Sequence, residues 1–362
     1  MRVVMAMSGG VDSSVAAALL LEAGYEVIGV TMQQWVGDLP YGTELEGGCC
    51  SLEAVDDARA IAGKLGIAYY VLNAHLPFRQ KVIDYFAEEY LKGRTPNPCV
   101  VCNRIFRFNL LLEKLAALDG DYLATGHYVR RYFNATNGRW AIKKGLDAGK
   151  DQSYVLYGLN QRQLEKSLFP LGEYTKAEIR RKAKELDFRV ADKPDSQEIC
   201  FIPDRDYGGF IQRYRPEAVQ PGNIVDESGK VLGKHRGIIH YTIGQRKGMG
   251  IAAAHPVYVK EIRAATHEVV VGKSEAVFGD RLVASNLNWV ALAGLDHEMP
   301  VEAKIRYAAK PTAALLKPLD GDRVEVIFEL PQRAITPGQA VVFYQGDIVL
   351  GGGTIESTPV HS

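Results

Sequence analysis

The sequence has 362 residues with equal numbers of basic and acidic side chains, 43 of each, and therefore no formal net charge at neutral pH. Its length suggests two or three domains with large apolar cores, and its neutrality means that any nucleic-acid surface must be a local patch. No apolar run reaches the ~20 residues of a membrane helix, and so little chain precedes the first functional loop that we expect neither a membrane anchor nor a signal or transit peptide.

The first two hundred residues alternate between strand and helix patterns. Short apolar, β-rich runs predict strands at residues 2–7, 26–32, 68–72 and 121–125. Apolar residues at helical spacing predict helices at residues 14–23, 51–65, 78–92 and 107–118, and a capping box at Thr175 and Glu178 opens another helix. This alternation indicates an α/β domain with a mostly parallel sheet and helices on both faces.

The pattern changes near residue 203. Residues 221–250 are rich in glycine and suggest short strands and turns, and from residue 281 onward the chain looks all-β, with proline and glycine turns between apolar runs. We therefore expect an α/β domain at residues 1–203, a small mixed or β central domain at 204–280, and a C-terminal β-barrel-like domain at 281–362.

The stretch SGGVDSS, Ser8 to Ser14, lies between the first predicted strand and the first predicted helix. A helix that begins at the end of a parallel strand presents free N–H groups and a positive dipole to anions. Gly9 and Gly10 let the backbone approach a phosphate closely, but the loop has no GK[ST] lysine and no GxGxxG pattern. The simpler alternative is a Gly-Ser turn with an ordinary helix cap at Asp12 or Ser13.

The five cysteines are Cys49, Cys50, Cys99, Cys102 and Cys200. An odd and sparse set in a chain of this length argues against a secreted disulfide framework and for a reducing compartment, so we expect a cytoplasmic protein. The adjacent pair Cys49 and Cys50 precedes a predicted helix and is interpreted as structural.

The segment TPNPCVVCN, Thr95 to Asn103, places Cys99 and Cys102 three residues apart in a loop that two prolines should keep extended. Such a pair suits a redox dithiol, half of a zinc site, part of an iron–sulfur site, or two core cysteines. Cys200 lies in the apolar run ICFI, where cysteine is more often a buried core residue than a chemical group.

Taken together, these segments resemble a known family. SGGVDSS is similar to the PP-loop of ATP pyrophosphatases. SGGVDSS, TPNPCVVCN, ATGHYVR, GKDQSYVL, KPDSQEICFI, HYTIGQRKGMGI and ITPGQAVVFY also follow one another in the order seen in tRNA-specific 2-thiouridylases. The resemblance covers nearly the whole chain. It implies an adenine-nucleotide-hydrolase-like parallel sheet, ATP with Mg²⁺ as cofactor, and replacement of the C2 oxygen of the wobble uridine of tRNA by sulfur.

The resemblance also assigns site residues. It implies Cys102 as the nucleophile and Cys200 as the persulfide carrier, with sulfur supplied by a relay protein or a cysteine desulfurase. The ATP site would be lined by Ala6, Met7, Ser8, Gly9, Gly10, Val11, Asp12, Ser13, Met32 and Gly126. Asn97, Pro98 and Cys99 would hold the target base, and the remaining tRNA contacts would be His127, Lys150, Asp151, Gln152, Arg306, Tyr307 and Gln339.

One residue departs from the family pattern. Many members have aspartate where this chain has Cys99, so the acid–base role of that aspartate either passes to a thiol or to another group. A further option is that Cys99, Cys102 and Cys200 together hold an iron–sulfur cluster, which we favour less than the persulfide route because the latter needs only two cysteines.

Other interpretations of the residues remain open. Lys234, His235, Arg236, Arg246 and Lys247, interleaved with Tyr241, are either solvated turns or phosphate and stacking contacts to RNA. The rival classes are another AMP-forming PP-loop ligase, a dithiol oxidoreductase and an inactive RNA-binding adaptor. A ligase would not need the cysteine pair, and a dithiol oxidoreductase would not need the nucleotide loop. An inactive adaptor would need neither motif.

Overall fold

A parallel sheet forms the centre of the N-terminal part of the computed structural model, which describes residues 1–34, 52–195, 199–252 and 255–358. The strand order is β3-β2-β1-β4-β7, and all neighbours are parallel, with Val3 of β1 opposite Val27 of β2 and Tyr122 of β4. The strands are β1 (Arg2–Ala6), β2 (Glu26–Gln33), β3 (Ala68–Asn73), β4 (Tyr122–Thr125) and β7 (Ser167–Leu168). The predicted α/β sheet is therefore confirmed.

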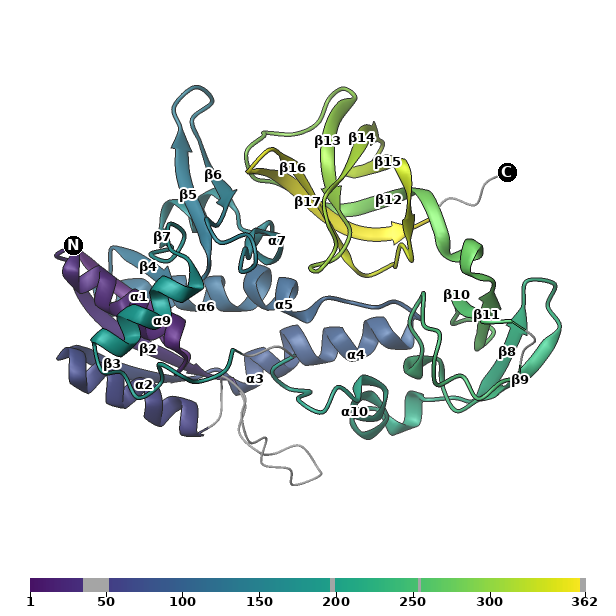
Figure 1. Ribbon diagram of the computed structural model, residues 1–362, viewed down its shortest axis with the longest axis horizontal. Helices are drawn as coiled ribbons and strands as arrows, with labels where there is room; N and C mark the ends of the chain where they lie inside the picture. The colour runs from purple at the N-terminus through teal and green to yellow at the C-terminus, as the bar shows by residue number, and fades with distance from the viewer. Residues whose placement is uncertain (35–51, 196–198, 253–254, 359–362) are drawn as a thin grey trace.

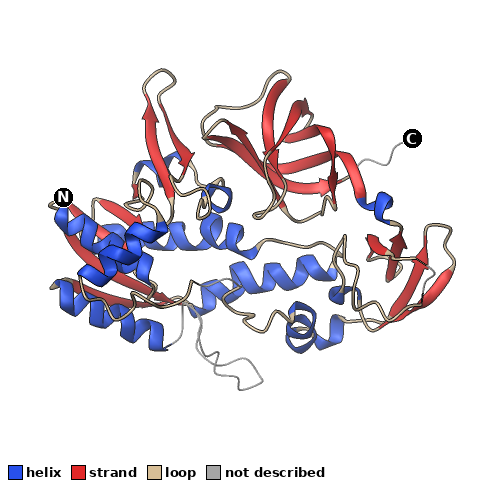
Figure 2. Ribbon diagram, viewed as in Figure 1, coloured by secondary structure: helices blue, strands red, loops and turns tan. Residues whose placement is uncertain are grey.

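Helices cover both faces of this sheet (Figure 2). Successive residues of a strand point to opposite faces, so Val3 and Met5 of β1 pack in one core and Val4 packs in the other. The first core includes α1 (Val11–Glu22), α2 (Leu52–Leu65) and α9 (Lys176–Glu185). The second includes α3 (His75–Phe78), η1 (Arg79–Ile83), α4 (Asp84–Leu91), α5 (Pro98–Val101), η2 (Cys102–Arg107) and α6 (Phe108–Leu115).

The helix that carries Cys102 begins earlier than its sequence suggests. We expected an extended loop at TPNPC and a helix only from residue 107, but helical structure starts at Pro98. Proline is well tolerated at the first helical position, where its missing N–H has no intrahelical partner to lose. The side chain of Asn97 caps this end by accepting hydrogen bonds from the N–H groups of Cys99 and Val100, at 3.1 and 3.2 Å. Cys102 consequently lies on a helix and not in a loop.

The central part of the chain is a small domain around a four-stranded sheet in the order β10-β11-β8-β9. Its strands are β8 (Gly222–Asp226), β9 (Val231–His235), β10 (Tyr258–Arg263) and β11 (Glu268–Gly272), and α10 (Tyr207–Tyr214) precedes them. A separate apolar core holds Ile224, Tyr241 and Val259. The expected mixed, mostly β domain is confirmed.

The C-terminal part is an antiparallel barrel (Figure 1). Its strands pair in the order β12-β15-β14-β13-β16-β17, and β17 pairs back to β12, which closes the barrel. They are β12 (Phe278–Trp289), β13 (Met299–Lys304), β14 (Thr312–Leu319), β15 (Arg323–Arg333), β16 (Ala340–Gln345) and β17 (Ile348–Ser357).

A hairpin from the N-terminal part extends the barrel sheet. It consists of β5 (Val129–Asn134) and β6 (Arg139–Lys144), and β6 pairs with β17 through Ile142 and Lys143. Side chains of the same region donate to barrel carbonyls: Arg139 to Trp289 at 3.0 Å, and the hydroxyl of Tyr154 in α7 (Ser153–Leu156) to Ala340 at 2.8 Å. These bonds fix the barrel relative to the α/β domain.

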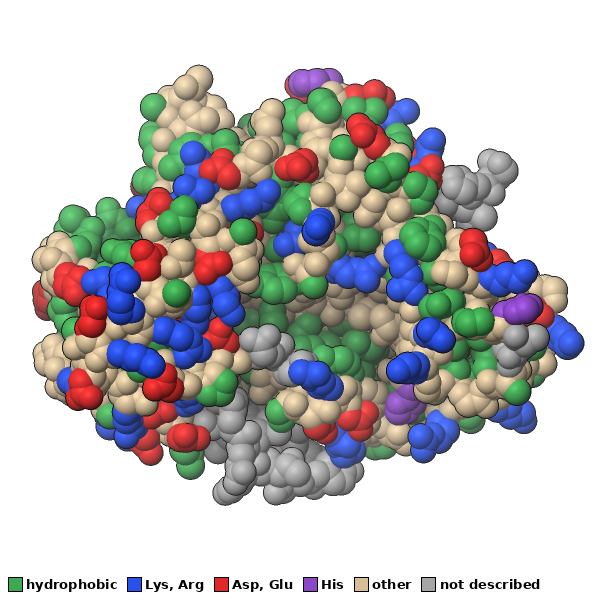
Figure 3. All heavy atoms as spheres, in the orientation of Figure 1, with side chains coloured by type: hydrophobic (Ala, Val, Ile, Leu, Met, Phe, Trp, Pro, Cys, Tyr) green, Lys and Arg blue, Asp and Glu red, His purple; other side chains and the backbone are tan. Residues whose placement is uncertain are grey.

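The face of the molecule in Figure 3 is hollowed between these parts, and Lys and Arg side chains lie around the edge of the hollow. Across the described ranges, no helix combines the length and apolar composition needed to cross a membrane.

Candidate active site

The loop between β1 and α1 presents the first turn of α1 to a cavity. Gly10 is the N-cap residue, and no side chain in the described chain caps this end, so the first N–H groups of the helix remain available to an anion. The N–H of Ser8 donates to Ser13 Oγ at 3.1 Å, and Ser14 Oγ donates to the carbonyl of Gly10 at 2.9 Å. These bonds fold the loop back onto the start of the helix.

Gly9 is required by the shape of this loop. Its φ is +69°, and a Cβ atom built on it would lie 2.1 Å from the carbonyl oxygen of Ala54 in α2. Gly126, after β4, is close to the other side of the helix start, because its Cβ would lie 3.0 Å from the backbone nitrogen of Ser13. Because neither glycine has a side chain, the loop can contact the backbone of α2 and the segment after β4 can contact the backbone of the first turn of α1.

The cavity at this point has a volume of about 720 Å³. All ten residues for which the sequence predicted ATP contact line it: Ala6, Met7, Ser8, Gly9, Gly10, Val11, Asp12, Ser13, Met32 and Gly126. Four of the residues predicted to contact tRNA line the same cavity: His127, Lys150, Gln152 and Tyr307. Arg107, at the end of the helical turn that starts at Cys102, also lines it. The nucleotide loop and part of the predicted tRNA contact set thus face one space.

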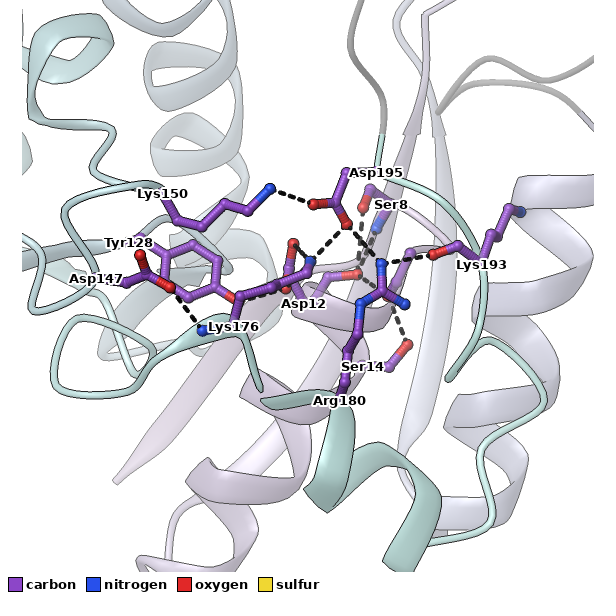
Figure 4. A network of polar contacts seen from close by, with 12 residues as sticks. Ser8, Asp12, Ser14, Tyr128, Asp147, Lys150, Lys176, Arg180, Lys193 and Asp195 are labelled. Carbon is purple, nitrogen blue, oxygen red and sulfur yellow. Dashed lines mark hydrogen bonds and ion pairs between the residues drawn. The ribbon is translucent and has the colours of Figure 1, made fainter. Parts of the chain in front are cut away.

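Figure 4 shows a network of ion pairs beside this cavity, and Asp12, Lys150 and Asp195 of the network line it. The ammonium group of Lys176 lies 2.7 and 2.8 Å from the two carboxylate oxygens of Asp12 and 2.7 Å from Oδ1 of Asp195. Asp195 also forms ion pairs with Lys150, whose Nζ lies 2.7 Å from Oδ2, and with Arg180, whose Nη2 lies 3.1 Å from Oδ1. The hydroxyl of Tyr128 donates to Asp12 Oδ1 at 2.7 Å.

The charges of this network shift the pKa values of its members. Partial burial of Asp195 acts to raise its pKa, but hydrogen bonds from Lys150 and Lys176 outweigh that effect and hold its pKa below the usual value. Burial, together with the charge of Asp12, raises the pKa of Tyr128 far above its ordinary range. At neutral pH, Asp195 is therefore an anion and Tyr128 a neutral donor.

His127 is buried beside the loop, with 8% of its surface exposed. Its Nδ1 lies 2.8 Å from the hydroxyl of Thr125, and its ring stacks on Phe108 with centroids 6.3 Å apart. Burial and the charge of Arg107 lower the pKa of His127 to about 3, so the imidazole is neutral at physiological pH. It can therefore offer a hydrogen bond to a ligand without adding charge.

Cys102 and Cys200 lie in or against the same apolar core. Cys102 is buried within it, Cys200 is half-buried and packs against it, and Cys99 is exposed. Phe78 joins the two segments, because its ring contacts Phe106 at 5.4 Å and Phe201 at 5.8 Å between centroids. Residues 196–198 of the Cys200 motif and the pair Cys49 and Cys50 lie outside the described residues.

The described chain contains no cluster of three or more His, Cys, Asp or Glu side chains arranged to hold a metal ion. The iron–sulfur alternative needs Cys99, Cys102 and Cys200 to lie together as metal ligands. In this structure the three cysteines do not form such a cluster.

The barrel reaches the site through two loops. The hydroxyl of Tyr307 donates to the carbonyl of Asp151 at 3.3 Å, and the amide of Gln339 donates to the carbonyl of Thr95 at 2.8 Å, two residues before Asn97. Arg306 donates to the carbonyls of Arg333 and Ala334 within the barrel. The carboxylate of Asp151 accepts hydrogen bonds from the N–H groups of Gly145 and Ser153, and the amide oxygen of Gln152 accepts one from the N–H of Tyr128. These residues hold the loops around the cavity in place.

The basic cluster of the central domain divides into two kinds of residue. Lys234, Arg236, Arg246 and Lys247 are exposed. His235 and Tyr241 are buried, and Tyr241 belongs to the core of the central domain. The interpretation of Tyr241 as a base-stacking residue is therefore wrong, because its ring already packs among apolar side chains.

Sequence reasoning missed Arg107 in the lining of the cavity, and it missed Tyr128, Lys176 and Asp195 in the ion-pair network. Tyr128 lies in ATGHYVR and Asp195 in KPDSQEICFI, so both were inside quoted motifs without a role. Lys176 is the first residue after the capping residue Thr175, and only the three-dimensional fold brings it to Asp12, 164 positions away in sequence.

The fold and the loop define the class of protein as an α/β domain of the HUP type with appended β domains. Three family models match the chain: "tRNA methyl transferase HUP domain" at residues 1–204, "tRNA methyl transferase PRC-barrel domain" at 208–273, and "Aminomethyltransferase beta-barrel domain" at 279–355. Curated relatives identify a particular family within this class. The chain is 56% identical to "tRNA-specific 2-thiouridylase MnmA 1" of Thermoanaerobacter pseudethanolicus over 98% of both chains. It is 57% identical to "tRNA-specific 2-thiouridylase MnmA" of Heliobacterium modesticaldum over 98% of this chain and 92% of the relative. The chain belongs to the tRNA-specific 2-thiouridylase family.

Among solved structures, a 4-thiouridine synthetase–RNA complex with bound ATP is similar with a TM-score of 0.37, at 17% identity over 60% of this chain and 51% of that one. A likeness at this level carries no argument about function.

Proposed function

We propose that this protein is a cytoplasmic tRNA-uridine 2-sulfurtransferase, which uses ATP to replace the C2 oxygen of the wobble uridine by sulfur. The observation that carries the proposal is the shared cavity. The residues of the anion-binding loop line it together with His127, Lys150 and Arg107, and Arg107 belongs to the helical turn that Cys102 begins. The nucleotide and the uridine can therefore meet in this cavity, and the helical segment that carries Cys102 contributes Arg107 to its lining.

In the first step the uridine oxygen O2 attacks the α-phosphorus of ATP, and pyrophosphate leaves. The uncapped N-terminus of α1 and the hydroxyl groups of the loop would hold the phosphates. The attack converts a carbonyl oxygen, which cannot leave C2, into AMP, which can. Neutral His127 would donate a hydrogen bond in the cavity. The N3 proton of the uridine leaves to solvent water as the O2–phosphorus bond forms.

The chemistry of the cavity wall fits Mg²⁺. Asp12 and Asp195 line the cavity, and each accepts three contacts from neighbouring side chains, which leaves about one of the four lone-pair sites of each carboxylate for a ligand. Mg²⁺ is commonly held by one or two carboxylates together with substrate phosphates. When bound, the ion would neutralise charge on the triphosphate. Asp12→Ala is expected to abolish pyrophosphate release without unfolding the protein.

In the second step sulfur replaces AMP. A persulfide on Cys200 carries the sulfur that attacks C2. The thiolate of Cys102 attacks the inner sulfur atom, Sγ of Cys200, which breaks the persulfide S–S bond and forms a Cys102–Cys200 disulfide. The outer sulfur is released at the oxidation level of sulfide, attacks C2 and expels AMP. An external thiol then reduces the disulfide, and a sulfur relay protein or cysteine desulfurase reloads Cys200. Both cysteines are reduced in this structure and lie in or against the same apolar core, and the step requires their sulfur atoms to come within bonding distance.

Nucleotide products and thiol variants test the proposal. We expect tRNA-dependent release of AMP and pyrophosphate, and loss of thiolation but not of adenylation in Cys102→Ser and in Cys200→Ser. ADP as the product would contradict the nucleotide assignment. A fully active Cys200→Ser variant would contradict the role of Cys200 and leave it as a core residue.

A further inference from the structure

The loop of the nucleotide site contains no lysine, but a lysine from a distant helix lies directly behind it. Lys176 is the first residue of α9, where the capping box of Thr175 and Glu178 fixes the backbone. Its own N–H donates to the carboxylate of Asp147 at 2.9 Å. Only 8% of its surface is exposed. The fold therefore holds both the backbone and the side chain of Lys176 in place.

The geometry around its ammonium group is specific to lysine. An ammonium group has three N–H donors, and three carboxylate oxygens lie 2.7 to 2.8 Å away: both oxygens of Asp12 and Oδ1 of Asp195. One cation therefore joins two carboxylates that come from opposite ends of the domain sequence.

Both carboxylates face the cavity, whereas Lys176 is not among the described residues that line it. An uncompensated pair of carboxylates in the lining of the cavity would repel the polyphosphate of ATP, because like charges a few ångströms apart repel strongly near a protein surface. Lys150 and Arg180 help to neutralise Asp195, but Asp12 relies on Lys176 for its ion pair.

We propose that Lys176 is a positioning residue that makes this cavity accept a polyphosphate, by neutralising and aligning Asp12 and Asp195 from behind. The inference rests on the proposed use of ATP and deepens it. Lys176 acts through the two carboxylates and does not touch the nucleotide, so its effect on binding grows with the number of phosphates on the ligand.

A structural role alone would give a different pattern. If Lys176 only held α9 against α1, its loss would loosen the whole site and weaken adenosine and ATP binding alike. Lys182 is the matched control, because it also lies on α9 and also pairs with α1, through Glu22 at 3.3 Å, and is not among the residues that line the cavity.

The experiment is equilibrium binding of adenosine, AMP and ATP to the wild-type protein and to Lys176→Met, Lys176→Arg and Lys182→Met, with unfolding curves for each. For Lys176→Met we expect ATP affinity to fall roughly 10- to 100-fold and adenosine affinity to stay within about twofold of the wild type. AMP should fall between the two. Lys176→Arg should lose less, because it keeps the charge, and Lys182→Met should bind all three ligands as the wild type does.

A double variant extends the test to the case in which Lys176→Met is unstable. Lys176→Met with Asp195→Asn removes one of the two carboxylate charges that line the cavity and should recover part of the ATP affinity. Equal losses for adenosine and ATP, or unchanged ATP binding in Lys176→Met, would overturn the inference while the proposed function stands. A wild-type protein that binds no ATP would overturn the proposed function and the inference with it.

Discussion

Replacing Gly9 by alanine, which adds one methyl group to the loop of the nucleotide site, should reduce activity more than the same change at the other end of α1. Gly9→Ala places a Cβ atom 2.1 Å from the carbonyl oxygen of Ala54, whereas real Cβ contacts begin near 3.0 Å. The loop and α2 must therefore separate by nearly an ångström. A positive φ also costs a residue with a side chain roughly 1–2 kcal/mol.

Gly24→Ala separates these two effects. Gly24 follows the C-terminal end of the same helix with φ +81°, and a Cβ atom there meets nothing within 4 Å. It therefore carries the backbone cost without the clash. Both variants should lose about 1–2 kcal/mol of unfolding free energy, with a further loss in Gly9→Ala from the clash with Ala54.

The activities of the two variants should diverge. Displacement of a substrate-holding group by about 1 Å can cost on the order of 100-fold in rate, so Gly9→Ala should release pyrophosphate about 100-fold more slowly than the wild type, and Gly24→Ala at close to the wild-type rate. Urea denaturation and a pyrophosphate-release assay at saturating tRNA measure both quantities. Equal rates in the two variants would refute the idea that this loop is held in place by its contact with α2.

Three further predictions concern other parts of the molecule. Arg246→Ala with Lys247→Ala should weaken tRNA binding and flatten its salt dependence by about 0.7 to 0.9 in log–log slope for each phosphate that the variant no longer neutralises, and filter binding at several salt concentrations would show an unchanged slope if the pair is only a solvated surface. Cys99→Asp should retain much of the thiolation activity, because aspartate is common at this position in the family; complete loss in a thiolation assay would point to a required thiol at residue 99. Burial lowers the pKa of His127 from 6.5 to about 3; between these values the unfolded chain binds a proton that the folded protein does not, so His127 should make the unfolding free energy fall by about 1.4 kcal/mol for each pH unit below 6.5. Urea unfolding at pH 7 and pH 5 should show a smaller fall in His127→Asn, and identical falls would contradict a buried neutral imidazole.

The elements built from local patterns were predictable. An apolar run, glycines and helical spacing within one stretch of sequence predicted the strand at Arg2–Ala6, the loop after it and a helix at residues 14–23, which begins three residues earlier, at Val11. The all-β structure predicted after residue 280 from apolar runs and turns is also confirmed. The domain boundaries near 203 and 280 and the roles of the site residues stay predictions.

The features that the sequence did not reveal depend on contacts between distant residues. Pro98 was interpreted as part of an extended loop, but it begins a helix because Asn97 supplies the cap. The pairing of β6 with β17 joins residues 142 and 349 and leaves no signal in either strand. Tyr241 resembled a stacking residue between basic side chains, yet the fold buries it. The pairing of Lys176 with Asp12 likewise exists only after the chain has folded.

The most direct test of the central claim is mass spectrometry of the nucleosides of tRNA incubated with the protein, ATP, Mg²⁺ and a persulfide source. We expect the wobble uridine to gain the mass difference between sulfur and oxygen only when ATP is present, with AMP and pyrophosphate formed alongside. An unmodified wobble uridine under these conditions, or a mass gain equal to a methyl group, would contradict it.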